Sequence, residues 1–234
     1  MFSIIAKNLE VVRRRISAIS IASGRDAATV QLLAVSKTFS ADDIRAAYTA
    51  GQKAFGENYM REALDKIAEL HLLRGLIEWH FIGPIQSNKT RAIAEQFDWV
   101  HSIDRLKIAR RLSEQRPTHL PPLNVCIQVN ISGEASKGGV APSDIAALVC
   151  DVALLPRLRV RGLMSIPEPI FGLHIQCTPH RRLRELFNAI NAQGLNLDTL
   201  SMGMSTDFSA AILEGATIIR VGTAIFGTRT YLAH

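Results

Sequence analysis

The sequence contains few cysteines, and this shortage argues against two classes of protein. Its three cysteines, Cys126, Cys150 and Cys177, are widely separated and match no zinc-binding spacing. An odd number of cysteines without a secretory context favours free thiols in a reducing compartment. We therefore expect neither a disulfide-stapled fold nor a metal site, and we expect a cytoplasmic location.

Long apolar segments are also missing. No stretch approaches the roughly 18 apolar residues of a membrane-spanning helix. Residues 1–20 carry apolar side chains at helical spacing, but Lys7, Glu10 and the run Arg13-Arg14-Arg15 interrupt them. Because a signal peptide needs an uninterrupted apolar segment, this pattern predicts a surface helix and no membrane association.

A basic stripe of the kind that binds nucleic acids is absent as well. Lys and Arg number 27 against 21 Asp and Glu, so the net charge is +6. The clusters Arg13-Arg14-Arg15, Arg110-Arg111 and Arg181-Arg182 lie in helical patterns without interleaved aromatic residues. They are typical of solvated helix faces, and the overall charge favours anionic small ligands over nucleic acid.

What the sequence does contain is a regular alternation of short apolar segments and amphipathic helical patterns. The apolar segments are rich in β-branched and aromatic residues, as parallel strands buried on both faces should be. The predicted strands are 31–36, 53–55, 79–82, 99–102, 124–129, 159–163, 199–201 and 218–221. The predicted helices between them are 41–50, 59–72, 88–95, 105–114, 143–152, 180–193 and 208–213.

This order predicts an α/β fold, a (β/α)8 barrel that forms a single domain over residues 1–234 with an extra N-terminal helix. The alternative is an open doubly wound sheet. Such a sheet usually carries a Gly-x-Gly-x-x-Gly turn after its first strand, which residues 34–38 lack.

Helix boundaries are indicated by capping residues. Ser40 and Ser143 are expected to cap the starts of two helices, and Gly51 and Gly194 to end two others. Residues 167–179 contain proline, glycine and cysteine, and they predict an irregular loop before the helix that begins at residue 180.

In a (β/α)8 barrel, functional residues gather where the strands end. The residues expected at this rim are Lys37, Glu57-Asn58, Gly83-Pro84, Asp104, Asn130, Met164-Ser165, 201–205 and Gly222-Thr223. Polar and glycine residues are therefore concentrated at one end of the predicted barrel.

Lys37 is the most informative of these residues because it follows the apolar run 32–36. A buried lysine is costly unless it is paired or used, and burial favours the neutral amine that attacks an aldehyde. The alternative is a lysine whose stem covers apolar surface while its ammonium group reaches water.

The last two strands are followed by residues suited to phosphate, at 201–205 and at Arg220-Val221-Gly222-Thr223. Glycine turns bind phosphate through backbone N–H groups and hydroxyls. Together with Lys37 on the adjoining first strand, they predict a site for an aldehyde-bearing phosphorylated cofactor, a description that pyridoxal 5′-phosphate fits. Arg220 would face the ring nitrogen of this cofactor or, alternatively, pair with a carboxylate such as Glu57.

Seven motifs in order along the chain resemble the YggS/PROSC-type family of pyridoxal phosphate homeostasis proteins, related in fold to the N-terminal barrel of alanine racemase. The motifs are 33–38, 55–59, 79–89, 129–131 with 136–139, 161–164, 201–207 and 220–227. The resemblance implies the fold-type III barrel of pyridoxal phosphate proteins.

The resemblance also implies roles for individual residues. Lys37 would hold the cofactor as a Schiff base, and Arg220 would face the pyridine nitrogen. The residues implied for phosphate are Ser201, Gly222 and Thr223, and those implied for the pocket wall are Asn58 and Met164.

Four features of the sequence receive no cofactor role. His80 lies in a family motif that does not separate a pocket role from a structural one. Lys89 and Lys137 are interpreted as solvated lysines, and residues 171–178 match no family pattern.

A racemase needs a base on each face of the bound amino acid. In alanine racemase the second base is a tyrosine from another domain, which this sequence is expected to lack. Tyr48, Tyr59 and Tyr231 lie in or beside helical patterns or in the C-terminal tail, and none is an obvious second base.

We therefore expect a monomeric, non-enzymatic carrier that buffers or delivers pyridoxal 5′-phosphate, with apo enzymes as transient recipients. A slow amino-acid racemase is the alternative. A barrel that has lost its cofactor is disfavoured by the presence of both Lys37 and the phosphate motif.

Overall fold

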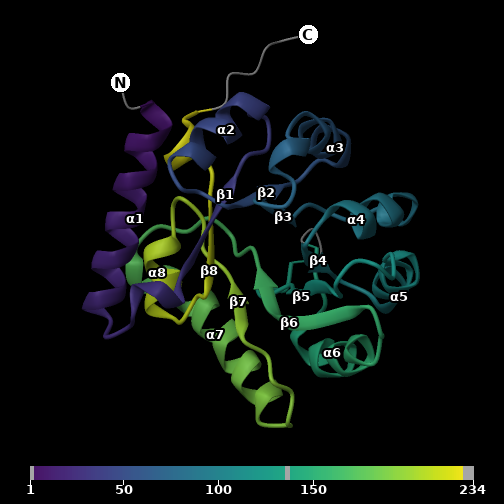
Figure 1. Cartoon of the computed structure of the whole chain (residues 1–234). Coiled ribbons are helices and arrows are strands. Elements are labelled where there is room, and N and C mark those ends of the chain that lie inside the picture. Colours follow the sequence, from purple (N-terminus) through teal and green to yellow (C-terminus); the bar gives the residue numbers. More distant parts are fainter. Residues whose placement is uncertain (1–2, 135–137, 229–234) are drawn as a thin grey trace.

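Eight parallel strands close into a barrel in chain order (Figure 1). The computed structural model describes residues 3–134 and 138–228. Its strands are β1 Gln31–Val35, β2 Ala54–Glu57, β3 Glu78–Phe81, β4 Trp99–Ile103, β5 Leu123–Val129, β6 Leu158–Ser165, β7 Thr199–Ser201 and β8 Ile218–Val221. Because β8 pairs with β1, with Leu33 opposite Arg220, the predicted barrel is confirmed and the open sheet is wrong.

Helices surround the barrel on its outside, as Figure 1 shows. They are α1 Ile4–Ala22, α2 Ala41–Thr49, α3 Met60–Glu69, α4 Thr90–Gln96, α5 Leu106–Gln115, α6 Ile145–Ala153, α7 Leu173–Asn191, α8 Phe208–Leu213 and α9 Thr223–Phe226. Short 3-10 turns precede α4 at Ser87–Lys89 and α6 at Pro142–Asp144, and one follows α3 at His71–Leu73. No helix in the described ranges combines the length and apolar character needed to cross a membrane.

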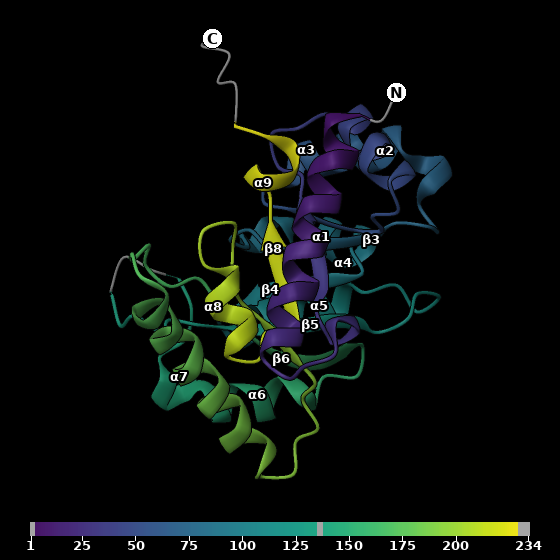
Figure 2. The same ribbon diagram turned by 90° about the vertical axis from the view of Figure 1, so that its left-hand side faces the viewer.

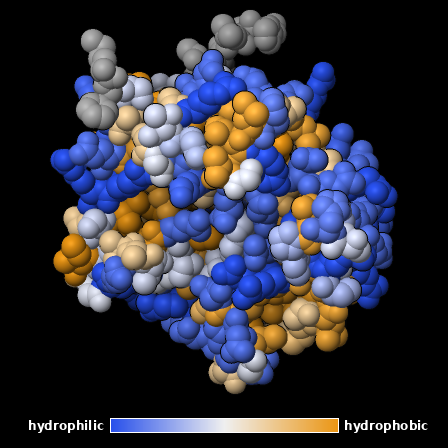
Figure 3. Space-filling model, in the orientation of Figure 1, coloured by the Kyte–Doolittle hydropathy of each residue, from blue (hydrophilic) through white to orange (hydrophobic). Residues whose placement is uncertain are grey.

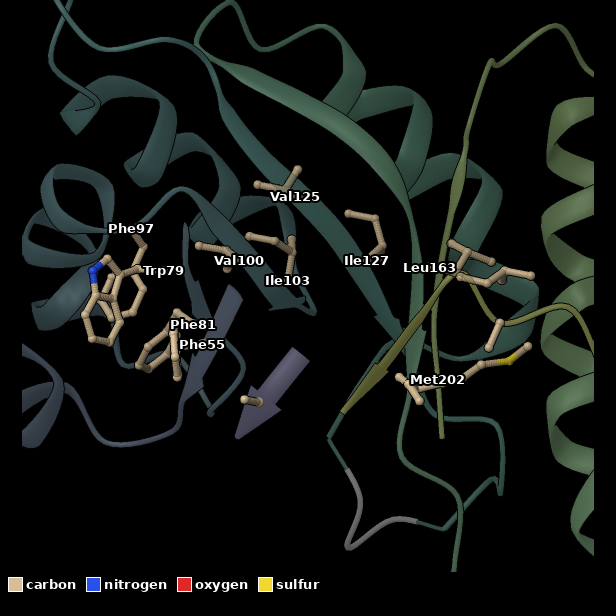
Figure 4. Packing of buried hydrophobic residues seen from close by; sticks show 14 of the residues in the cluster. Phe55, Trp79, Phe81, Phe97, Val100, Ile103, Val125, Ile127, Leu163 and Met202 are labelled. Atoms are coloured by element: carbon tan, nitrogen blue, oxygen red, sulfur yellow. The ribbon is translucent and has the colours of Figure 1, made fainter. Parts of the chain in front are cut away.

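Two apolar cores result from the alternation of side chains along the strands. The larger one lies between strands and helices, and Figure 4 shows Phe55, Trp79, Phe81 and Phe97 gathered within it. His80, between Trp79 and Phe81 on β3, points the opposite way, into the barrel. Burial of each of these aromatic side chains contributes roughly 1.5–3 kcal/mol to the stability of the fold. Because side chains alternate along a strand, fixing the outward-facing residues also fixes which residues face the interior.

The smaller core fills part of the barrel interior. Its residues are Leu33, Val35, Ala54, Ile82, Trp99, Cys126, Met164 and Ile218, and all are buried. They come from strands on all sides of the barrel, so the interior is packed and is not a pore.

The expected N-terminal surface helix is α1, which lies beside α2, α8 and α9 (Figure 2). It begins with a cap in which Ser3 Oγ accepts from Ala6 N at 3.2 Å. Its buried stripe is Ile5, Leu9, Val12, Ile16 and Ser20. Asn8 donates to the Ile225 carbonyl of α9 at 2.9 Å, so α1 supports the segment that follows β8. On the face seen in Figure 3, hydrophilic residues separate small hydrophobic patches.

The expected loop over 167–179 is wrong in its second half, because α7 already begins at Leu173. Pro179 lies inside this helix, and a proline there costs about 3 kcal/mol of helix stability. The helix nevertheless forms because it buries Cys177, His180 and Leu183 on one face. Tertiary packing thus overrides the local proline signal.

The helix caps were predicted with mixed success. Ser40 caps α2 in a capping box with Asp43, and Gly51 follows α2 with φ 84°. Gly194, with φ 91°, lies in the turn just beyond α7. Ser143 is not the expected cap, because the chain first makes a 3-10 turn and its hydroxyl donates to Asp144 Oδ1.

Candidate functional site

A cavity of about 250 Å³ opens at the carboxyl ends of the strands. Its described lining residues are Val35, Lys37, Phe39, Asn58, Ile82, Ile166, Met204, Ser205, Thr206, Arg220, Gly222 and Thr223. Five residues singled out from the sequence therefore meet there: Lys37, Asn58, Arg220, Gly222 and Thr223. We call this space the rim cavity.

Lys37 is half-buried in a turn that follows β1 rather than at the tip of the strand itself. The turn is held from below, since Ser36 Oγ donates to Glu57 Oε1 at 2.6 Å and Lys66 Nζ donates to the Ser36 carbonyl at 2.7 Å. The next residue, Thr38, has φ 68°, a strained value for a β-branched residue. The surrounding contacts thus fix the backbone that presents Lys37.

The buried pair of Glu57 and Lys66 stabilises this turn. Lys66 Nζ lies 2.9 Å from Glu57 Oε1, and both side chains are almost completely buried. Burial raises the pKa of Glu57, while the charge of Lys66 and the hydrogen bond from Ser36 act against that rise. The alternative in which Arg220 pairs with Glu57 is wrong, because Lys66 occupies that position.

Arg220 is buried in the floor of the rim cavity, with 4% of its surface exposed. Its Nη1 donates to Ser201 Oγ and its Nη2 donates to the Ser165 carbonyl, each at 2.8 Å. Burial lowers the pKa of Arg220 to about 10, against the opposing influence of Asp207 and Cys126. The guanidinium is therefore still a cation at neutral pH, and its orientation is fixed by two acceptors.

Ser201 and Met164 are not among the residues that line the rim cavity. Both are completely buried below it, and they lie opposite each other on β7 and β6. The Ser201 hydroxyl contacts Arg220 and His101, so it lies below the guanidinium. The hydroxyl-bearing residues of the same segment that line the cavity are Ser205 and Thr206.

The loop that carries Ser205 is shaped by Asp207. Asp207 Oδ1 accepts from Met204 N at 2.6 Å, and Oδ2 lies 3.1 Å from His180 Nε2 of α7. Burial alone would raise the pKa of Asp207, but the contacts with His180 and Met204 and the charge of Arg220 lower it overall. Gly203 has φ 90°, and its carbonyl accepts from Arg220 N at 2.9 Å. The loop after β7 is thus tied to both α7 and β8.

Two glycines let backbone segments approach closely at the rim. A Cβ at Gly83 would lie 2.1 Å from the Asn58 carbonyl oxygen, so only glycine fits where β3 passes the end of β2. A Cβ at Gly222 would lie 3.1 Å from the Val35 carbonyl oxygen. The close approach of Gly83 to Asn58, and of Gly222 to Val35, keeps the backbone of Asn58 and Gly222 at the cavity.

Sequence reasoning missed Ser205 and Thr206 as cavity residues. A signal for Ser205 is present in the sequence, because residues 201–205 are expected at the rim, but the resemblance implies Ser201 for the phosphate. The last residue of a short strand can face the barrel interior, and the sequence does not show this. Lys89 is exposed in the 3-10 turn before α4. Ser136, Lys137 and Tyr231 lie outside the described residues.

Comparisons with known proteins agree with this architecture. Residues 5–230 match the family model described as alanine racemase, N-terminal domain. A Pseudomonas aeruginosa protein named pyridoxal phosphate homeostasis protein is 62% identical over 229 residues, covering 98% of this chain and 97% of the relative.

Two solved structures extend the comparison. PipY of Synechococcus elongatus PCC7942, whose structure has PLP bound, is 37% identical with a TM-score of 0.83, covering 95% of this chain and all of that one. Alanine racemase from Corynebacterium glutamicum is 18% identical with a TM-score of 0.66, covering all of this chain and 63% of the racemase. The racemase likeness concerns the fold alone. The chain belongs to the family of pyridoxal phosphate homeostasis proteins, built on the barrel of the alanine racemase N-terminal domain.

Proposed function

We propose that this protein binds pyridoxal 5′-phosphate reversibly at the rim cavity and takes part in the homeostasis of this cofactor. The observation that carries the proposal is the meeting of Lys37, Arg220, Ser205, Gly222 and Thr223 around one cavity. Lys37 would supply an amine for the aldehyde, and Arg220 would be the residue that meets the ring nitrogen. When bound, the cofactor supplies an aldehyde that reacts with amines and a ring that withdraws electrons.

The residues present fit this ligand. Asn58 Oδ1 is buried and has no hydrogen-bond partner among the described residues, and Asn58 lines the cavity. Such an orphaned acceptor is costly unless a ligand donor satisfies it. Gly222 lines the cavity where a phosphate is expected, and its missing side chain lets this backbone pass close to Val35, whose carbonyl oxygen would lie 3.1 Å from a Cβ.

We assign the phosphate to Ser205, Gly222 and Thr223, and we give Ser201 a supporting role. The Ser201 hydroxyl is already engaged by Arg220 and His101. Ser205 belongs to the cavity wall and comes from the loop that Asp207 holds. Met164 packs below the cavity and supports the residues that line it.

A carrier is favoured over a racemase by the chemistry of the cavity wall. Among its described lining residues, Lys37 and Arg220 are the two ionisable ones. A guanidinium held by two acceptors is a poor base, so the wall offers one candidate base where a two-base racemase needs a second. Tyr59, which follows Asn58, is 53% exposed and is not among those lining residues.

We further propose that the protein is a cytoplasmic monomer that passes its cofactor to apo enzymes. Cys126, Cys150 and Cys177 are free thiols in the structure, which supports a reducing compartment. The open rim supports transfer, because the cavity is reached from solvent at the ends of the strands.

The Lys37→Ala variant tests the binding proposal. The wild-type protein incubated with pyridoxal 5′-phosphate should show the visible absorption band of a lysine-bound cofactor, and Lys37→Ala should lose it. Lys89→Ala, at an exposed lysine in the turn before α4, is the matched control and should keep the band. An unchanged band in Lys37→Ala would overturn the assignment.

Delivery is tested by mixing the loaded protein with an apo pyridoxal phosphate enzyme. We expect the enzyme to gain activity faster than the cofactor leaves the loaded protein spontaneously, as measured by the decay of the visible band. If activity instead rises at the rate of spontaneous release, the protein stores the cofactor but does not deliver it.

A further inference from the structure

A chain of polar side chains crosses the barrel interior below the rim cavity. From Arg220 Nη1 it passes to Ser201 Oγ at 2.8 Å, and from there to His101 Nδ1 at 2.8 Å. His101 Nε2 lies 2.9 Å from His80 Nδ1, and His80 Nε2 lies 2.6 Å from Glu78 Oε1. Five residues on four strands are therefore in continuous contact.

The two ends of this chain face opposite ends of the barrel. Arg220 lines the rim cavity, whereas Glu78 lines a groove of about 1320 Å³ at the amino ends of the strands. The Glu78 side chain is 41% exposed, while Ser201, His101 and His80 are completely buried. Protons can thus reach the chain from solvent at Glu78, on the side away from the ligand.

The pKa values of His101 and Glu78 are shifted by the groups around them. Burial, together with the charges of His80 and Arg220, holds the pKa of His101 well below its usual range, so His101 is neutral. Burial would raise the pKa of Glu78, but contacts with His80, Gln31 and Trp99 lower it overall.

Other neighbours complete this environment. Trp99 stacks on the His80 ring with 7° between the planes, and Arg161 lies over the Trp99 ring at 4.7 Å. Cys126 from β5 is kept neutral, because burial raises the pKa of its thiol to about 12. The negative charge of Asp207 opposes the lowering of the pKa of Arg220 by burial. His80 therefore lies between a neutral imidazole, His101, and a carboxylate, Glu78, with one ring nitrogen on each.

Donor counting gives two arrangements of the chain. Guanidinium groups only donate, so Ser201 Oγ always accepts from Arg220. With His80 neutral, Ser201 donates to His101 Nδ1, His101 Nε2 donates to His80 Nδ1, and His80 Nε2 donates to Glu78. With His80 protonated, the two middle bonds reverse. Ser201 Oγ then accepts from both His101 and Arg220, and the Ser201 hydroxyl hydrogen no longer donates to any member of this series of hydrogen bonds.

We propose that His80 and His101 are positioning residues for the rim cavity. Through them, protonation at the Glu78 end of the barrel changes the strength of the hydrogen bond between Ser201 and Arg220. The proposal rests on the proposed binding of pyridoxal 5′-phosphate and adds a regulatory input to that site. In the neutral arrangement the hydrogen bonds polarise one another toward the carboxylate and strengthen the hold on Arg220. Acidification adds a positive charge to this series of side chains and weakens the hydrogen bond between Ser201 and Arg220. The affinity for the ligand should therefore fall.

The test measures pyridoxal 5′-phosphate affinity at pH 7.5 and pH 5.5 in wild type, Glu78→Gln and Glu95→Gln. Glu95 lines the same groove but is not part of the chain, so it is the matched control. We expect Glu78→Gln to bind roughly fivefold more weakly at pH 7.5, because the amide oxygen still accepts from His80 but lacks the charge that strengthens this hydrogen bond. Its affinity should also change less between the two pH values than that of wild type or Glu95→Gln. Equal affinities and pH profiles in all three proteins would overturn the proposal.

A second measurement follows the histidines directly, without ligand. Nitrogen NMR of the imidazole groups should show His101 protonated at Nε2 at pH 7.5 and at Nδ1 at pH 5.5, with no reversal in Glu78→Gln. A His101 tautomer that stays constant in the wild type overturns the proposal. If the wild type binds no pyridoxal 5′-phosphate, the proposed function fails. This NMR experiment still decides whether the hydrogen bonds of His101 reverse with pH.

Discussion

Single residues decide what the rim cavity can bind, and they differ in how far sequence predicts them. Lys37, Asn58, Arg220, Gly222 and Thr223 reach the cavity as expected, because each lies at or just after the end of a strand. Ser201 and Met164 also occupy strand ends, but their side chains are buried below the cavity. Position along a strand is readable from sequence, whereas depth inside a closed barrel is not.

The two serines after residue 200 should have separable effects. Ser205→Ala should weaken the binding of inorganic phosphate about 10- to 150-fold, since a hydroxyl bonded to a charged group contributes roughly 1.5–3 kcal/mol. Ser201→Ala should weaken it less, because this hydroxyl contacts Arg220 and His101 instead. Calorimetric titration with phosphate measures both affinities. A larger loss of affinity in Ser201→Ala would show that Ser201, and not Ser205, binds the phosphate.

Secondary-structure elements place these residues through contacts that span neighbouring units. The turn after β1 depends on Glu57 at the end of β2 and Lys66 on α3. The loop after β7 depends on His180 of α7, a helix whose first residues were expected to be irregular. Local signals such as Pro179 mislead there, because burial of one helix face outweighs the cost of the proline.

Two glycines with nearly the same backbone angle provide a test of loop packing. Gly203 has φ 90°, and an added Cβ would lie 2.5 Å from Ala211 Cβ; Gly194 has φ 91° and open space around it. Gly194→Ala should cost about 1 kcal/mol of unfolding free energy from backbone strain, and Gly203→Ala about 3 kcal/mol because overpacking is added. Urea unfolding of both variants measures this, and equal losses would show that the loop yields to the added methyl group.

The molecule as a whole is a closed barrel with apolar packing outside its strands and a polar chain inside. The outer cluster around Phe55, Trp79 and Phe97 follows the predicted strand and helix patterns. The interior instead combines Leu33 and Ile218 with buried histidines. The alternation of apolar segments with amphipathic helical patterns indicated the outer core, but no sequence pattern indicated that His80 and His101 meet.

Acidification should destabilise the whole fold through carboxylates that are held by hydrogen bonds. The folded-state pKa of Asp207 is lowered, so its stabilising effect is complete above the ordinary aspartate value of 3.8 and is lost as pH falls through the lower folded value. Asp198 is lowered in the same way: burial alone would raise its pKa, but hydrogen bonds from Arg161 and Thr199 and the charge of Arg161 outweigh that.

The contribution of Asp207 is isolated by Asp207→Asn. This variant should be less stable than wild type at pH 7 and should lose less unfolding free energy between pH 7 and pH 3. Asp65→Asn, on the exposed side of α3, is the control and should keep the wild-type pH dependence. Denaturant unfolding at each pH provides the values, and a wild-type dependence in Asp207→Asn would rule out this source of acid sensitivity.

The sequence by itself determined the barrel, the order of its strands and the set of residues that gather at one rim. These features follow from local periodicity and from the rule that parallel strands present their carboxyl ends together. Only the tertiary structure decided which side chains meet: Ser205 at the cavity, Lys66 on Glu57, and His101 on Ser201, which is 100 positions away. Such contacts depend on barrel closure and on side-chain depth, and neither is encoded in any local pattern.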